Sequence, residues 1–163
     1  MKVSPKGVSW LKTIEKLHLI PYDDQTGKPI NKWVPGATIG YGHLIPRYEW
    51  DAYKDGISET QANHLFLNDL KPFEDIVNRM VGVGLPDHCF DALVILAFNI
   101  GETAFMTSSV VKYLTIPGFK NIYGNLEAAW KAFNKSQGKL NKGLQNRRAA
   151  EWDMYHDGVY RFW

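Results

Sequence analysis

Two acidic residues near the N-terminus have the residue type and spacing of a carboxylate pair. Glu15 lies on the apolar arc of a helical pattern, and Asp24 follows nine residues later in a segment rich in glycine and proline. A carboxyl group in apolar surroundings is suited to donate a proton, whereas one in polar surroundings stays ionised. Such a pair can cleave a glycosidic bond, because one group protonates the leaving oxygen while the other stabilises positive charge or activates water. Spacing alone also allows Glu15 to be an ordinary surface residue at the edge of an apolar stripe.

Two segments would position this pair. The apolar pattern predicts a helix over residues 5–19, with Pro5 in its first turn and Glu15 on its apolar face. Between residues 21 and 42, glycine and proline recur between short apolar stretches, which favours turns and a small antiparallel sheet. The helix would therefore carry Glu15, and the turns beside the sheet would carry Asp24.

The remainder of the chain has helical patterns. Ser58 and Gln61 form a capping box that opens a helix whose apolar stripe includes Asp69, and Pro72 should kink or split this helix. The segment 88–100 is apolar nearly all round, which is typical of a central, buried helix. Further helices are expected near residues 106–114, 125–134 and 143–157.

Length and composition bound the class of protein. A chain of 163 residues with 45% hydrophobic and 22% charged residues is typical of one folded domain. Its single cysteine, Cys89, excludes an internal disulfide, a cysteine-based zinc cluster and a CxxC redox site. The expected fold class is α+β, in one domain over residues 1–163. Its expected parts are a small sheet-bearing lobe (about 1–57), a linking helix (about 58–81) and a mostly helical lobe (about 82–163).

Several motifs in one order resemble the phage lysozymes, the T-even and lambdoid type of glycoside hydrolase. The first are Glu15, the segment Tyr22 to Asp24, and the segment Thr38 to His43, which reads TIGYGH. The later ones are Ile57 to Ala62, Phe90 to Leu93, Ala97 to Gly101, and Gly143 to Glu151. These matches extend from about residue 7 to residue 155, and they imply a lysozyme-like fold.

The resemblance also implies roles for individual residues of the small lobe. Glu15 would be the general acid, Asp24 the second carboxylate, and Thr38 the residue that positions the attacking water or the sugar. Taken alone, Thr38 could be an ordinary strand threonine. His43 and Asp69 match a structural pair that links the small lobe to the linking helix. Because Asp69 lies on an apolar stripe, where an unpaired carboxylate is costly, physical chemistry also predicts a partner for it.

Five further residues receive roles only through the resemblance. Leu44 and Phe98 match positions that line the saccharide cleft, although a phenylalanine in an apolar helix is often a core residue. Asn99 would offer its amide to an N-acetyl group. Either Arg147 or Arg148 matches an arginine that lies near the catalytic glutamate and tunes it, and the spacing does not choose between them.

One segment departs from the family pattern. Thirteen residues separate Asp24 from Thr38, more than in compact members of the family. This insertion, residues 25–37, is expected to form an extended hairpin beside the cleft, with Trp33 or Pro35 near its tip or turn.

A basic run near the C-terminus raises a different possibility. Six lysine and arginine residues lie between residues 131 and 148, with Trp130 and Phe133 interleaved, and such a pattern can form a nucleic-acid surface. No nucleic-acid recognition motif accompanies it, and the chain carries a net charge of only +2. The same charges would be attracted to an anionic cell wall or a lipopolysaccharide-bearing membrane, so nucleic acid is not the expected partner. The six residues are Lys131, Lys135, Lys139, Lys142, Arg147 and Arg148.

Taken together, the resemblance implies an endolysin. This muramidase would hydrolyse the β-1,4 bond between N-acetylmuramic acid and N-acetylglucosamine in the glycan strands of peptidoglycan. No metal or organic cofactor is implied, because two carboxylates and a water suffice. The chain shows neither a signal peptide nor a membrane-spanning segment. We therefore expect a monomer that accumulates in the host cytoplasm and reaches the wall through a separate holin-type membrane protein. The alternative is a non-catalytic wall-binding or scaffolding module on the same fold, which only the insertion favours.

Overall fold

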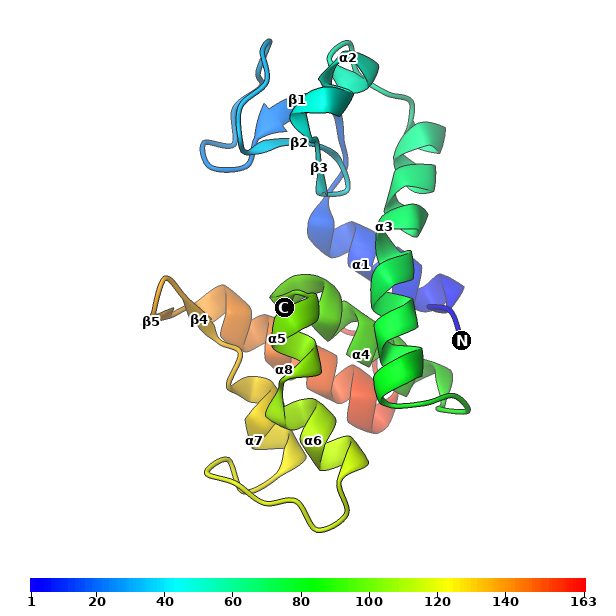
Figure 1. The fold of residues 1–163 in the computed structure, drawn as a ribbon, viewed down its shortest axis with the longest axis vertical. Helices are drawn as coiled ribbons and strands as arrows, with labels where there is room; N and C mark the ends of the chain where they lie inside the picture. The colour runs from blue at the N-terminus through cyan, green and yellow to red at the C-terminus, as the bar shows by residue number, and fades with distance from the viewer. The chain divides into compact units, whose positions relative to one another are not determined.

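The computed structural model, which describes residues 1–163, combines helices with a small antiparallel sheet (Figure 1). This composition confirms the expected α+β class. The chain divides into two compact units, each described here by itself. The sheet unit comprises Ser9–Lys71, and the helical unit comprises Met1–Val8 together with Pro72–Trp163. Two helices contribute to both units, namely α1 (Pro5–Glu15) and α3 (Glu59–Met80).

The sheet unit is built around three antiparallel strands in the order β1-β2-β3. Tyr22 of β1 lies opposite Thr38 of β2, and Thr38 in turn lies opposite Leu44 of β3. A small core forms beneath the sheet from Ala37, Ile39 and Ile45. The strands are β1 (His18–Asp23), β2 (Ala37–Gly40) and β3 (His43–Leu44), and the short turns η1 (Arg47–Glu49) and α2 (Trp50–Tyr53) follow them.

The first helix ends earlier than the apolar pattern predicts. α1 stops at Glu15 instead of residue 19, because Lys16 adopts a left-handed conformation with φ of 59° and β1 begins at His18. A residue in this conformation terminates a helix, and the chain then pairs with β2. Leu19, the last residue of the predicted helix, is instead an exposed residue of the strand. The correction leaves Glu15 as the last helical residue.

The insertion folds back onto the sheet unit. Tyr22 bridges to Pro29, and beyond this bridge Ile30 and Trp33 pack against the core of the sheet unit. The Trp33 indole N–H donates to the carbonyl of Ile45 at 2.9 Å. An extended hairpin with Trp33 at its tip is therefore wrong, because the large indole surface gains more by burial than by projecting into water. Pro35 does lie in a turn, as expected.

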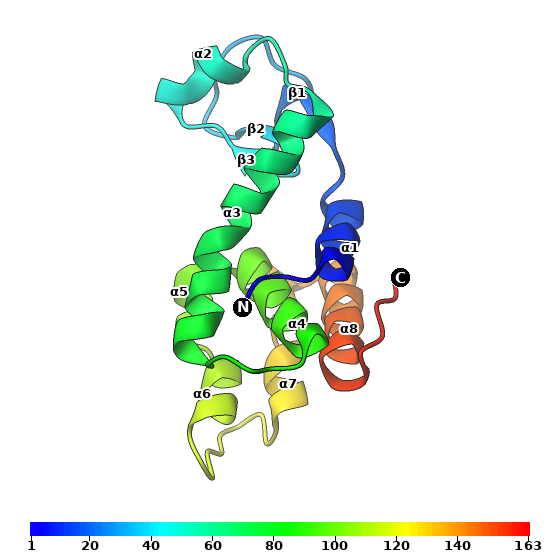
Figure 2. The ribbon, with the colours of Figure 1, turned by 90° about the vertical axis from the view of Figure 1, so that its right-hand side faces the viewer.

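The helical unit surrounds one buried helix, α4 (Asp87–Ile100), whose residues from Phe90 to Ala97 are all buried. This burial confirms the central helix predicted from the apolar pattern. α4 packs most extensively against α8 (Lys142–Asp157), and the two lie side by side in Figure 2. The other elements of this unit are α5 (Glu102–Met106), α6 (Ser109–Thr115), α7 (Leu126–Lys131), β4 (Lys135–Ser136) and β5 (Lys139–Leu140).

Two local predictions for the helices need correction. α3 passes through Pro72 as one helix and is not split, although the boundary between the two units falls at this proline. The helix expected over 125–134 stops at Lys131, and a β4–β5 hairpin follows. Its two-residue turn has φ of 49° at Gln137 and 76° at Gly138, which are the positive angles that tight hairpins require.

A buried carboxylate holds the start of α1. Asp91 of α4 accepts hydrogen bonds from the backbone N–H and the hydroxyl of Ser4, and from the hydroxyl of Tyr160. Burial and the charge of Asp91 raise the pKa of Tyr160 well above its ordinary value. The first turn of α1 is thereby anchored within the helical unit.

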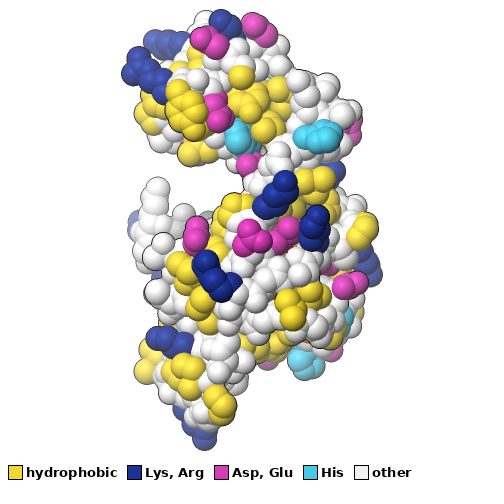
Figure 3. All heavy atoms as spheres, turned by 45° about the vertical axis from the view of Figure 1, so that its right-hand side comes forward, with side chains coloured by type: hydrophobic (Ala, Val, Ile, Leu, Met, Phe, Trp, Pro, Cys, Tyr) yellow, Lys and Arg dark blue, Asp and Glu magenta, His cyan; other side chains and the backbone are white.

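The surface carries charges of both signs. Acidic and basic side chains are interspersed on the face drawn in Figure 3, as expected for a net charge of +2. Trp130 of the basic run is fully buried, so its ring cannot stack on a base, and Lys131 pairs with Glu127. No helix is long and apolar enough to cross a lipid bilayer.

Candidate active site

Both predicted carboxylates, Glu15 and Asp24, lie at the ends of secondary-structure elements in the sheet unit. Glu15 ends α1, and Asp24 follows β1 directly. The pKa of Tyr22 is raised first by burial, then by the charge of Asp24 and then by that of Glu15. Glu15 lies beside the turn at Gly42, and the backbone of Asp24 is hydrogen-bonded to Gly36, so the structure places both predicted carboxylates next to the turns that flank β2.

Gly36, which sequence reasoning missed, links two of the predicted residues. Its carbonyl oxygen accepts the backbone N–H of Asp24 at 3.0 Å and the hydroxyl of Thr38 at 2.9 Å. A Cβ atom at Gly36 would overlap Asp24 Oδ1 and would lie 2.5 Å from Asp23 Oδ1. A larger side chain at this position would therefore push the two carboxylates aside, and a lone glycine in a loop gives no sign of this in the sequence.

A methyl group at Gly36 should displace the Asp24 carboxylate. We expect Gly36→Ala to lower activity by about 10- to 100-fold, the scale of a misplacement of about 1 Å. The melting temperature should change little, because the neighbouring carboxylates are flexible side chains at the surface. Gly143→Ala is the matched control, since its Cβ would meet only Asn141 Oδ1, at 3.2 Å. Parent-like rates of wall digestion by Gly36→Ala would contradict this account.

The remaining side of the site comes from β2, β3 and the turn between them. Thr38 is buried, and Leu44 opposite it is 56% exposed. The turn at Gly42, whose φ is 88°, lies close to the predicted acid. A Cβ atom added to the backbone of Gly42 would be 3.8 Å from Glu15 Oε2. The exposed Leu44 side chain therefore borders the buried Thr38, as a residue lining a saccharide site would.

His43 and Asp69 form the predicted ion pair within the sheet unit. The Nδ1 atom of His43 lies 2.9 Å from Asp69 Oδ2, and its Nε2 atom lies 3.7 Å from Glu49 Oε2. The pair joins β3 to α3. The hydrogen bond to Asp69 is the largest cause that raises the pKa of His43, and partial burial opposes it.

This pair should stabilise the protein in a pH-dependent way. Because the pKa of His43 is raised on folding, its contribution is complete below the unfolded value and is lost as the pH rises through the folded value. Asp69→Asn should therefore lower the free energy of unfolding by about 1.5 kcal/mol at about pH 5.5 and by much less at about pH 9. Thermal melts at both pH values test this, with the exposed Asp51→Asn as control. An equal loss at both pH values would contradict it.

Four predicted residues belong to the helical unit. Phe98 is half-buried and meets Phe73 edge to face, with 5.4 Å between the ring centroids. Asn99 is exposed, and its Oδ1 accepts from Arg148. This bond holds the carbonyl oxygen of the Asn99 amide. Arg147 and Arg148 are both buried on α8.

Glu151, also fully buried on α8, is a common partner of these arginines. It accepts from Arg147 Nε at 3.0 Å and lies 3.1 Å from Arg148 Nη2. Its other oxygen accepts from the Trp130 indole at 3.1 Å. Burial lowers the pKa of Arg148, whose Nε and Nη1 atoms have no hydrogen-bond partner. Sequence reasoning placed Glu151 only as the end of a motif and missed this role.

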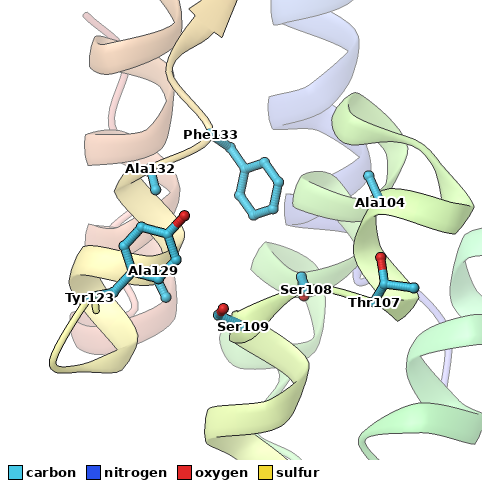
Figure 4. Close-up of a pocket in the computed structure, with 8 residues that line it drawn as sticks. All are labelled: Ala104, Thr107, Ser108, Ser109, Tyr123, Ala129, Ala132 and Phe133. Carbon is cyan, nitrogen blue, oxygen red and sulfur yellow. The ribbon is translucent and has the colours of Figure 1, made fainter. Parts of the chain in front are cut away.

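The helical unit also contains a cavity of about 310 Å³ that sequence reasoning did not predict (Figure 4). Its wall combines hydroxyl groups with small and aromatic apolar side chains, and the Phe133 ring points into it. Serine, threonine and alanine near helix ends have no spacing signal that could have indicated it. The lining residues are Ala104, Thr107, Ser108, Ser109, Tyr123, Ala129, Ala132 and Phe133.

Comparison with known proteins places this chain in a family. The model of the phage lysozyme family matches residues 12–151. The endolysin of Bacillus phage PZA is 35% identical over 160 residues, which cover 98% of this chain and 57% of that protein. This chain thus spans just over half the length of the Bacillus phage relatives that it matches.

Solved structures agree with the sequence comparison. An endolysin from Escherichia coli O157:H7 phage FAHEc1 superposes with a TM-score of 0.74 at 32% identity, covering 99% of this chain and 97% of that one. The muramidase domain of SpmX from Asticaccaulis excentricus superposes with a TM-score of 0.72 at 27% identity, covering 95% and 97%. The chain belongs to the phage lysozyme family.

Proposed function

We propose that this chain is a lysozyme-type hydrolase that cleaves the β-1,4 bond between N-acetylmuramic acid and N-acetylglucosamine in peptidoglycan. The observation that carries the proposal is the placement of the three residues around β2: the carbonyl of Gly36 accepts from Asp24 and Thr38, and the turn at Gly42 lies beside Glu15 Oε2. Hydrolysis of a glycosidic bond typically uses two carboxyl groups, one on each side of the bond. The endolysin relatives and the muramidase domain of SpmX support the choice of substrate.

Each of the three residues has a distinct task in this proposal. Glu15 protonates the glycosidic oxygen as the bond breaks. Asp24 remains ionised and either stabilises the oxocarbenium-like sugar or activates the water that attacks it. Thr38, tied to Asp24 through the carbonyl of Gly36, positions that water or the sugar.

Other residues would bind the glycan strand or support the acid. Leu44 and Phe98 supply apolar surface for sugar rings, and Asn99 offers its amide N–H groups to an acetamido carbonyl. Arg147 or Arg148 tunes Glu15. In its biological setting the protein would act as a monomer, reach the wall from the host cytoplasm with the help of a holin-type protein, and lyse the host cell.

Digestion of purified peptidoglycan tests the proposal and identifies the bond. New reducing ends would be reduced with borohydride, and the products would be analysed by mass spectrometry. A muramidase releases fragments that end in reduced N-acetylmuramic acid. Fragments that end in reduced N-acetylglucosamine, or released peptides without new sugar ends, would overturn the assignment. Wall binding without any cleavage would favour the non-catalytic module.

A further inference from the structure

The insertion between Asp24 and Thr38 contains a pocket that the proposed mechanism does not use. Figure 1 draws the insertion as the light-blue loops beside β1 and β2. The pocket has a volume of about 380 Å³, and its lining is mostly apolar, with one cation and no carboxylate. Pockets of this composition bind ligands that present carbon atoms to the walls and a few polar groups at fixed positions. The lining residues are Pro29, Ile30, Asn31, Lys32 and Val34.

The sheet unit holds this pocket in place. Its first wall runs beside β1, because Tyr22 bridges to Pro29 and the backbone N–H of Ile30 donates to the carbonyl of Pro21 at 3.1 Å. Ile30 and Val34 also pack against the core of the sheet unit. The pocket therefore exists before a ligand arrives, and a ligand that binds there has little loop ordering to offset.

Lys32 supplies a positive charge that no group of the chain neutralises. Its side chain is exposed and forms no ion pair. A second cation without an ion pair, Arg47, lies over the ring of the neighbouring Trp33, 5.7 Å from the ring centroid. Asn31 adds an exposed amide, which can both donate to and accept from a peptide group. A ligand with a carboxylate, peptide groups and aliphatic carbon therefore matches the pocket, whereas a neutral sugar would leave the charge of Lys32 unpaired.

The pocket also lies within reach of the proposed catalytic residues of the same unit. Neighbouring strands are about 5 Å apart, so Pro29 lies about one strand spacing from β1, which Asp24 follows directly. Peptidoglycan carries short acidic peptides, the stem peptides, on its N-acetylmuramic acid residues. A stem peptide of four residues spans about 13 Å when extended, which exceeds the spacing of two neighbouring strands.

We propose that this pocket of the insertion binds a stem peptide of peptidoglycan, and that Lys32 pairs with a carboxylate of that peptide. The inference rests on the proposed function and deepens it, because it adds a peptide subsite beside the site of glycan cleavage. It also gives the insertion a task in the choice of substrate.

Two substrates that differ only in their peptides test the proposal. One consists of soluble, uncrosslinked glycan strands with intact stem peptides, and the other consists of the same strands after an amidase has removed the peptides. Lys32→Gln should raise KM on the peptide-bearing strands about three- to fivefold, the scale of one exposed ion pair, and leave kcat unchanged. On the stripped strands it should match the parent. Lys28→Gln is the matched control, because Lys28 is an exposed lysine of the same insertion that does not line the pocket.

Binding of the free peptide checks the pocket without any turnover. Backbone amide signals would be followed by NMR while the free stem peptide, or the same peptide with its carboxylates amidated, is added. The signals of Asn31, Lys32 and Val34 should shift with the free acid, and should shift much less with the amidated peptide or in Lys32→Gln. Saturable shifts with poly(glycerol phosphate) but not with the peptide would overturn the peptide assignment.

The outcomes separate this inference from the proposed function. A rise in KM that is confined to peptide-bearing strands supports the inference. An unchanged KM on those strands overturns it and leaves the muramidase assignment intact, since the parent still cleaves the glycan. An equal loss on both substrates also overturns it, because Lys32 would then act on the glycan or on folding. A parent protein that cleaves neither substrate overturns the proposed function, and the NMR titration then still decides whether the pocket binds the peptide.

Discussion

Replacing Glu15 with glutamine should lower the rate of wall hydrolysis by at least about a hundredfold, the lower range of general-acid contributions. Glutamine preserves the size of the side chain at the end of α1 but cannot donate a proton to the glycosidic oxygen. Because no cavity opens, the circular dichroism spectrum should remain that of the parent. The decrease in optical density of a peptidoglycan suspension measures the rate.

A carboxylate elsewhere in the same unit provides the control for this substitution. Glu59 is exposed at the start of α3, and Glu59→Gln makes the same chemical change without touching the site. It should digest the wall at the parent rate. If correctly folded Glu15→Gln also cleared the wall at the parent rate, Glu15 would not be the acid, and most of the proposed mechanism would fall with it.

The helices were predictable where a local signal agrees with burial. Ser58 and Gln61 make the reciprocal capping-box bonds that their spacing indicates, at 2.8 and 3.1 Å. The all-round apolar segment over 88–100 is the buried α4 because no face of it could meet water cheaply. In both cases a few residues that are neighbours in the sequence are enough to determine the local structure.

The predictions that the structure corrects failed because their causes are non-local or lie in a single residue. α1 ends at Glu15 because Lys16 takes a left-handed conformation, which a lysine rarely signals in advance. The insertion packs inward because Trp33 meets Ile45, a residue twelve positions away that only folding brings close. The β4–β5 hairpin depends on the pair Gln137 and Gly138, of which only the glycine is a recognisable turn residue.

The candidate site shows the same division. Glu15, Asp24 and Thr38 could be proposed as site residues because the family motif names positions along the chain. Gly36 could not be given a task in that way, since its importance depends on where the carboxylates point after folding. Glu151 likewise gained its importance only when two arginines and an indole proved to converge on it.

Because these three side chains converge on Glu151, its replacement should strongly destabilise the helical unit. Glu151→Gln keeps the shape but removes the counter-charge of the fully buried Arg148, and loss of one partner of a buried pair typically costs about 3–5 kcal/mol. For a chain of this size the melting temperature should fall by about 10 °C. Asp153→Asn on the same helix is the control, because its partner Arg161 is partly exposed and such pairs contribute little. If the two variants melted at the same temperature, the buried network on α8 would not hold the helical unit together.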